Sequence, residues 1–146
     1  MQLKALAENS IKSIAAGAAV GGTAGVQGSV SVNYSYSNVW AQILNSTITA
    51  KNDIVLEALS QGSTIQSLAG TVSGGGVAGV GIALAVNHMS NSYSASIDNS
   101  VLVSGSQGLN LTASNDASIS SLSASGGGGQ VGVNGSIAIN FINNQV

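Results

Sequence analysis

The sequence repeats itself with a period of about 54 residues, and this repeat limits the possible folds more than any other feature. The motif VSVN at 30–33 has counterparts LAVN and IAIN, whose asparagines follow at intervals of 54 and 53 residues. A second motif, IKSI at 11–14, recurs twice, each time 54 residues later. Such a unit cannot bury its apolar face alone, so we expect neighbouring copies to stack on one another.

Within each copy, apolar residues alternate with other residues, which is typical of a β-strand with one buried face. In the first copy the alternating residues are Val30, Val32 and Tyr34, and we expect this apolar side to be the buried one. Turn-forming residues separate the runs, for example at 45–46, 61–63 and 106–108. The pattern predicts about six strands per repeat, consistent with two coils of roughly 27 residues each; three coils, or one flattened coil with a long hairpin, are the alternatives.

The expected fold is therefore all-β, a parallel β-solenoid in which the backbone of each coil pairs with the next. Gly, Ala and Ser supply 64 of the 146 residues, and such small side chains let the coils wind tightly. The predicted copies span 1–52, 53–107 and 108–146, the first and last incomplete, in one continuous solenoid cut from a longer array. The three glycine-rich segments at 21–25, 74–79 and 126–129 are expected to form tight corners.

The composition argues against most other classes of function. Only 5% of the residues are charged, against about 25% in an ordinary domain, so phosphate contacts to nucleic acid are not expected. The absence of cysteine removes disulfides, zinc–thiolate sites and thiol catalysis. The glycine-rich segments lack the lysine of a phosphate-binding loop. We expect no enzyme activity, no cofactor and no metal.

One uncharged stretch, residues 14–32, is long enough to cross a bilayer as a helix. It consists mostly of Gly, Ala, Ser and Thr and contains Gln27. We therefore expect no membrane insertion.

Two columns of equivalent residues are the main site candidates. Asn33, Asn87 and Asn140 share one position of the repeat, and Tyr34, His88 and Phe141 share the next. Stacked asparagines can hydrogen-bond as a ladder, so the first column is interpreted as structural, with ligand contact as the alternative. The second column is interpreted as a stack of rings along the solenoid, with catalysis by His88 as the alternative. Tyr34, Tyr36 and Trp40 form the main aromatic cluster and could contact a glycan or receptor, although the second copy has serine in place of Tyr36 and Trp40.

Three segments resemble known bacterial exoproteins. Residues 47–58, TITAKNDIVLEA, resemble the coil pattern of filamentous haemagglutinin-like exoproteins. Residues 79–87 and 132–140 are similar to a glycine- and valine-rich segment of large repetitive adhesins and leukotoxin-like surface proteins. The resemblance implies a right-handed β-helix, exported across the outer membrane, often by two-partner secretion, and used in adhesion, aggregation or biofilm.

The leading functional hypothesis is a structural stalk segment of a secreted or cell-surface filamentous adhesin, located outside the cell. Its expected partners are neighbouring coils of the same chain or other copies joined end to end. One alternative is a self-assembling extracellular fibre, because the outermost coils leave strand edges unpaired. The other is a binding module in which Tyr34, Tyr36 and Trp40 contact a host or bacterial surface glycan or receptor.

Overall fold

The computed structural model describes residues 1–105 and 108–146, and these form eleven β-strands without a helix. The strands pair with one another in parallel. Their bounds are β1 Gln2–Ala7, β2 Ser10–Gly21, β3 Ala24–Leu44, β4 Thr47–Ala50, β5 Ile54–Ser60, β6 Ser63–Gly75, β7 Ala78–Asp98, β8 Val101–Ser104, β9 Leu109–Ser114, β10 Ala117–Gly128 and β11 Val131–Gln145.

The strands assemble into stacked sheets with the orders β1-β5-β9, β2-β6-β10, β3-β7-β11 and β4-β8. Each residue pairs with its equivalent one repeat later, as Val30 does with Leu84 and Leu84 with Ile137. The expected parallel β-solenoid arrangement is confirmed. One repeat is one flattened coil of four strands, so the predicted six strands were wrong, and of the alternatives for the coil number the structure shows one flattened coil and not two or three. That count presumed strands of ordinary length, about 5–6 residues, whereas β3 and β7 have 21 residues each.

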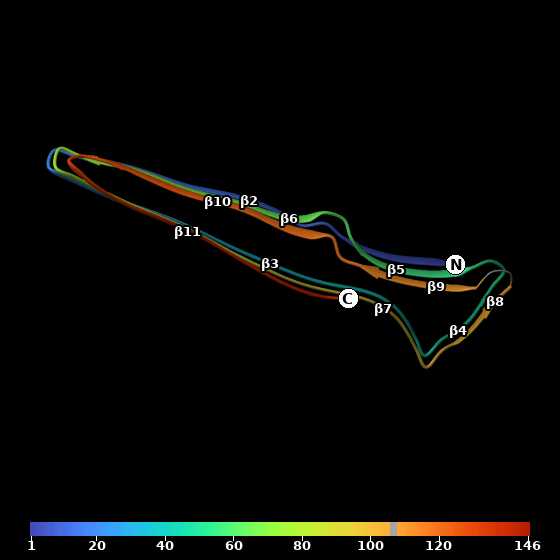
Figure 1. Ribbon diagram of the computed structural model, residues 1–146. Coiled ribbons are helices and arrows are strands. Elements are labelled where there is room, and N and C mark those ends of the chain that lie inside the picture. Colours follow the sequence, from blue (N-terminus) through green and yellow to red (C-terminus); the bar gives the residue numbers. More distant parts are fainter. Residues whose placement is uncertain (106–107) are drawn as a thin grey trace.

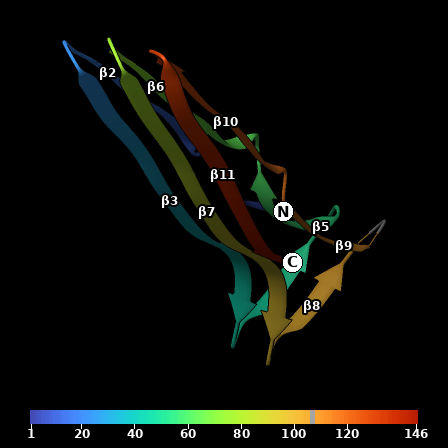
Figure 2. The ribbon, with the colours of Figure 1, turned by 60° about the vertical axis from the view of Figure 1, so that its left-hand side comes forward.

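Each coil is flattened, with a narrow end and a wide end (Figure 1). At the narrow end β2 turns directly into β3, and the two long strands run back alongside each other. At the wide end the chain turns through β4 into β5 and encloses a roughly triangular space. Figure 2 shows the coils side by side, with β3, β7 and β11 as neighbouring ribbons.

The aliphatic core lies in the wide end. Its buried members include Ile54 and Leu56 from β5, and Tyr93 from β7 is almost fully buried among them. The flattened part has a different interior, made mainly of Ala, Ser, Thr and Asn side chains, with Ile65 and Met89 also fully buried there. An added Cβ at Gly81 would lie 3.1 Å from the carbonyl oxygen of Gly126. A larger side chain therefore does not fit at this position between the sheets.

The expected orientation of the alternating face was wrong. Val30 and Val32 point outward and are 61% and 68% exposed, whereas Ser29, Ser31 and Asn33 are buried. The physical reason is the close approach of the two sheets, where the inward positions of β3 face Ser13 and Ser67 and are filled by hydroxyl and amide side chains. Ser31 bridges the gap, with its Oγ 2.8 Å from that of Ser13 and 3.0 Å from that of Ser67.

The glycine-rich segments form the turns at the narrow end, as expected. An added Cβ at Gly25 would overlap the Gly74 carbonyl oxygen of the next coil. At the wide end, Asn45 and Asn99 occupy equivalent corners with φ of 47° and 45°, a conformation that asparagine tolerates better than most residues. The turn expected at 106–108 includes Ser106 and Gln107, which lie outside the described residues.

The stretch 14–32, which could span a bilayer by length, forms most of β2 and the start of β3. In the described part of the chain, no helix with the length and hydropathy needed to cross a membrane is present.

Candidate functional site

The asparagine column lies inside the flattened part of the coil. Asn33 Nδ2 donates to Asn87 Oδ1 at 2.7 Å, and Asn87 Nδ2 donates to Asn140 Oδ1 at 2.8 Å. Asn87, in the middle coil, has 0% exposed surface. Asn33 Nδ2 also lies 2.8 Å from Ser13 Oγ of the facing sheet. These amides are used by one another and by neighbouring hydroxyls, so the column joins the coils rather than presenting groups to a ligand.

A second asparagine pair, which the sequence interpretation treated only as a turn, joins the coils at the wide end. Asn99 Nδ2 donates to Asn45 Oδ1 at 2.6 Å. The backbone N–H of Ser46 donates to Ser100 Oγ at 3.0 Å. The signal was present, because the pair Asn-Ser recurs at an interval of 54 residues.

The aromatic column lies on the outer surface of the β3-β7-β11 sheet. The rings of Tyr34 and His88 are stacked, with centroids 4.9 Å apart and an interplanar angle of 4°. Phe141 follows at 6.3 Å from His88 with a tilt of 42°. The three rings form a ridge that crosses all three coils.

Tyr36 and Trp40 project from the same face of β3, beyond the aromatic ridge. Their partners in β7 are Ser90 and Ser94, so the small side chains of the second coil leave a hollow beside the rings. The hollow has a volume of about 350 Å³ and is lined by Tyr36, Asn38, Trp40, Ser90, Asn91, Ser92, Asn143 and Gln145. Asn38 Nδ2 donates to the Tyr36 hydroxyl at 2.6 Å. The lining combines aromatic surface with amides and hydroxyls and contains no charged residue.

Next to the aromatic ridge, the same sheet carries a flat aliphatic surface, here called the aliphatic face. It consists of outward-pointing columns that run across the three coils. The columns are Val26–Val80–Val133, Val30–Leu84–Ile137 and Val32–Val86–Ile139. Between the column at Val26 and the column at Val30, Ile82 of the middle coil points outward, flanked by glycines of the other two coils. Exposed apolar patches of this kind usually mark interaction surfaces.

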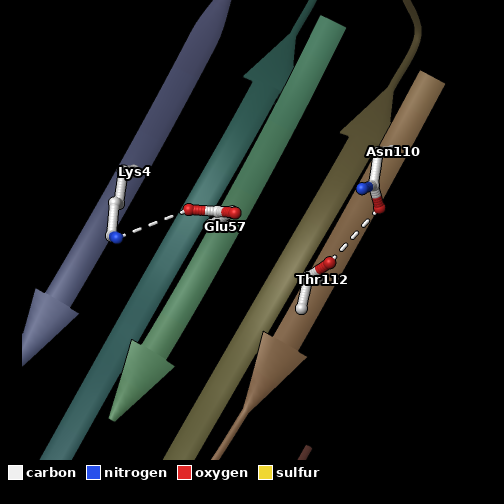
Figure 3. A network of polar contacts seen from close by, with 4 residues as sticks. All are labelled: Lys4, Glu57, Asn110 and Thr112. Carbon is white, nitrogen blue, oxygen red and sulfur yellow. Dashed lines mark hydrogen bonds and ion pairs between the residues drawn. The ribbon is translucent and has the colours of Figure 1, made fainter. Parts of the chain in front are cut away.

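Charged side chains gather at the wide end instead. Lys4 of β1 and Glu57 of β5 occupy paired positions, and their Nζ and Oε2 atoms lie 3.6 Å apart (Figure 3). Glu57 pairs with Thr112 of β9 in the third coil. The hydroxyl of Thr112 donates a hydrogen bond to Asn110 Oδ1 at 3.3 Å (Figure 3). Within residues 1–105 and 108–146, no cluster of three or more His, Asp or Glu side chains could hold a metal ion.

Family models, curated proteins and solved structures were compared with the chain, and none matches it.

Proposed function

We propose that this chain is a structural stalk segment of a bacterial filamentous adhesin, secreted or held at the outer cell surface. The observation that carries the proposal is the residue-by-residue stacking of one repeat on the next along all four faces of the coil. The resemblance of 47–58, 79–87 and 132–140 to exported adhesins supports the location outside the cell. The segment acts mechanically, by holding another part of the protein away from the cell.

The physical basis of stiffness is the number of cross-connections between coils. Backbone hydrogen bonds join each pair of layers, and the asparagine columns at Asn87 and Asn99 add side-chain bonds in the same direction. Bending the stack would break several of these bonds together. A stack of this kind extends by one strand spacing, about 4.8 Å, for each added coil.

The test is to lengthen the stack. Six further copies of residues 54–107 are inserted after 107, and the particles are measured by electron microscopy and small-angle scattering. The proposal expects straight particles about 29 Å longer, at about 4.8 Å per coil, with an unchanged cross-section. Particles that grow in all directions, or that bend freely along the array, would contradict a stalk.

A second candidate is end-to-end assembly into a fibre. The sheets end on one side with β1, β2 and β3, and on the other with β9, β10 and β11, whose outer backbone edges can template further pairing. Filaments formed by the purified chain that disappear when a charged capping domain is fused to either end would favour this candidate.

A third candidate is binding of a neutral saccharide in the hollow beside Tyr36 and Trp40. Sugar rings present C–H surface to aromatic rings and hydroxyls to amides, and both kinds of group line this hollow. The matched variant replaces each ring by the residue of the second coil, Tyr36→Ser with Trp40→Ser. Loss of binding on a glycan array with unchanged folding would support the candidate, and equal binding would refute it.

A further inference from the structure

The hollow beside Tyr36 and Trp40 is part of a trench that runs along β7. From 90 to 96, every outward position of β7 is a serine, and these short side chains form the floor. Tyr36 and Trp40 of β3 stand on one side of the floor. Asn143 and Gln145 of β11 stand on the other side, next to the first two serines. The register of the three strands therefore produces a trench with an aromatic wall and an amide wall.

The aromatic ridge closes one end of this trench. His88 occupies the outward position just before the serines, with its ring between those of Tyr34 and Phe141. The two walls are separated by two strand spacings, about 9.6 Å, and Tyr36 and Trp40 are about 13 Å apart along β3. A single sugar ring cannot reach both aromatic side chains, whereas a chain of several sugars can.

We infer that the trench binds an extended, neutral oligosaccharide of β-1,4-linked pyranoses, which lies along β7 with its sugar rings against Tyr36 and Trp40. The inference rests on the third candidate above, a saccharide site, and adds the shape of the ligand and its direction on the sheet.

The groups that form the trench match the surface of such a chain. Tyr36 and Trp40 are 59% and 58% exposed, so the C–H faces of sugar rings can stack on them. The bond from Asn38 Nδ2 to the Tyr36 hydroxyl, at 2.6 Å, holds the ring in place before a ligand arrives, which lowers the entropy cost of binding. Sugar hydroxyls meet the serines of the floor and the amides of Asn143 and Gln145, and these groups both donate and accept hydrogen bonds.

The charge and the shape of the trench narrow the class of ligand. Its three strand segments lie within the uncharged stretches 13–50, 58–97 and 117–146, so an anionic chain would find no counter-charge. The floor follows a single extended strand. Chains with β-1,4 linkages are extended ribbons that can follow such a floor, whereas α-1,4-linked chains curve into helices and leave it.

The experiment measures binding to the full chain by isothermal titration calorimetry. The probes are cello- and chito-oligosaccharides of two to six residues, with malto-oligosaccharides of the same lengths for comparison. Ser92→Leu and Ser90→Leu each fill the floor and leave both aromatic rings in place. Ser120→Leu is the matched control, because it makes the same change at an exposed outward position of β10 in the opposite sheet. Circular dichroism checks the folding of each variant, and if one floor variant fails to fold, the other carries the test.

The inference expects at least one β-1,4-linked series to bind, with an affinity that rises at least tenfold from the disaccharide to the tetrasaccharide. Either floor variant should weaken binding of the tetrasaccharide at least tenfold, and Ser120→Leu should leave it unchanged. Equal affinity for the malto-oligosaccharides, or unchanged binding by the floor variants, would overturn the inference while the saccharide candidate stands. If neither β-1,4-linked series binds at millimolar concentration, the inference is also wrong, and the glycan array decides the saccharide candidate separately.

Discussion

At the scale of single residues, the interior of the flattened part depends on polar side chains that satisfy one another. Asn87 donates to Asn140 and accepts from Asn33; the bond to Asn33 is buried and the bond to Asn140 is partly buried. The interval between the asparagines was enough to predict that they share a column. The sequence could not show that the column faces inward, because alternation defines two faces without saying which one is buried.

Replacing Asn87 by Ala removes both of these bonds, while Asn33 keeps its bond to Ser13 and Asn140 keeps its bond from Ser121. At about 1 kcal/mol for each lost bond, we expect the free energy of unfolding to fall by about 2 kcal/mol. The control is Asn38→Ala, which removes an exposed bond to Tyr36 and should change stability by less than about 0.5 kcal/mol. Urea denaturation measures both variants, and equal effects would show that the column is not buried.

At the scale of the elements, glycine and alanine set the distance between the two long sheets. The sequence predicted strands, corners and parallel stacking, because these follow from alternation, turn residues and the repeat. It did not predict the length of β3 and β7, since serine and asparagine between the apolar residues resemble turn signals. The orientation of these strands follows from the sheet that faces them. An added Cβ at Gly81 of β7 would lie 3.1 Å from the Gly126 carbonyl oxygen of β10, so a larger side chain does not fit at this inward position.

Two neighbouring residues of β7 test this orientation directly. Ala85 is fully buried between the sheets, and Val86 points outward. Ala85→Leu should destabilise the fold by about 1–3 kcal/mol through overpacking, and Val86→Leu should have little effect. Thermal unfolding measures the stability of both variants. The comparison is sensitive to orientation because a shift of one residue in register would bury Val86 and expose Ala85. The reverse order of stabilities would mean that the aliphatic residues are inside.

The turn at the narrow end has a similar internal control. A methyl group at Gly25 would overlap the Gly74 carbonyl oxygen, whereas one at Gly22 meets nothing within 4 Å. Gly25→Ala should therefore lower the free energy of unfolding by about 3 kcal/mol, and Gly22→Ala should leave it within about 0.5 kcal/mol. If denaturation shows both variants to be equally stable, the turns of successive coils are not in contact.

At the scale of the whole molecule, one repeat makes one layer of the stack. The period of 54 residues was visible in the sequence, but it allowed one flattened coil, two coils or three. The choice depends on whether β2 and β3 run their full length before turning, which is a property of sheet packing rather than of local sequence. The stalk and the fibre both presuppose this single-coil layer.

Engineered disulfides test the single-coil layer most directly, because the chain has no cysteine of its own. Val26 and Val80 pair in register between adjacent coils, and paired strands lie about 4.8 Å apart, within the range that a disulfide spans. Val26→Cys with Val80→Cys should cross-link within one chain on mild oxidation. Val26→Cys with Asp53→Cys should not, because 26 lies near the narrow end of the coil and 53 at the wide end (Figure 1). Cross-linking of the second pair without the first would contradict the single coil, because it is the result that two coils per repeat require.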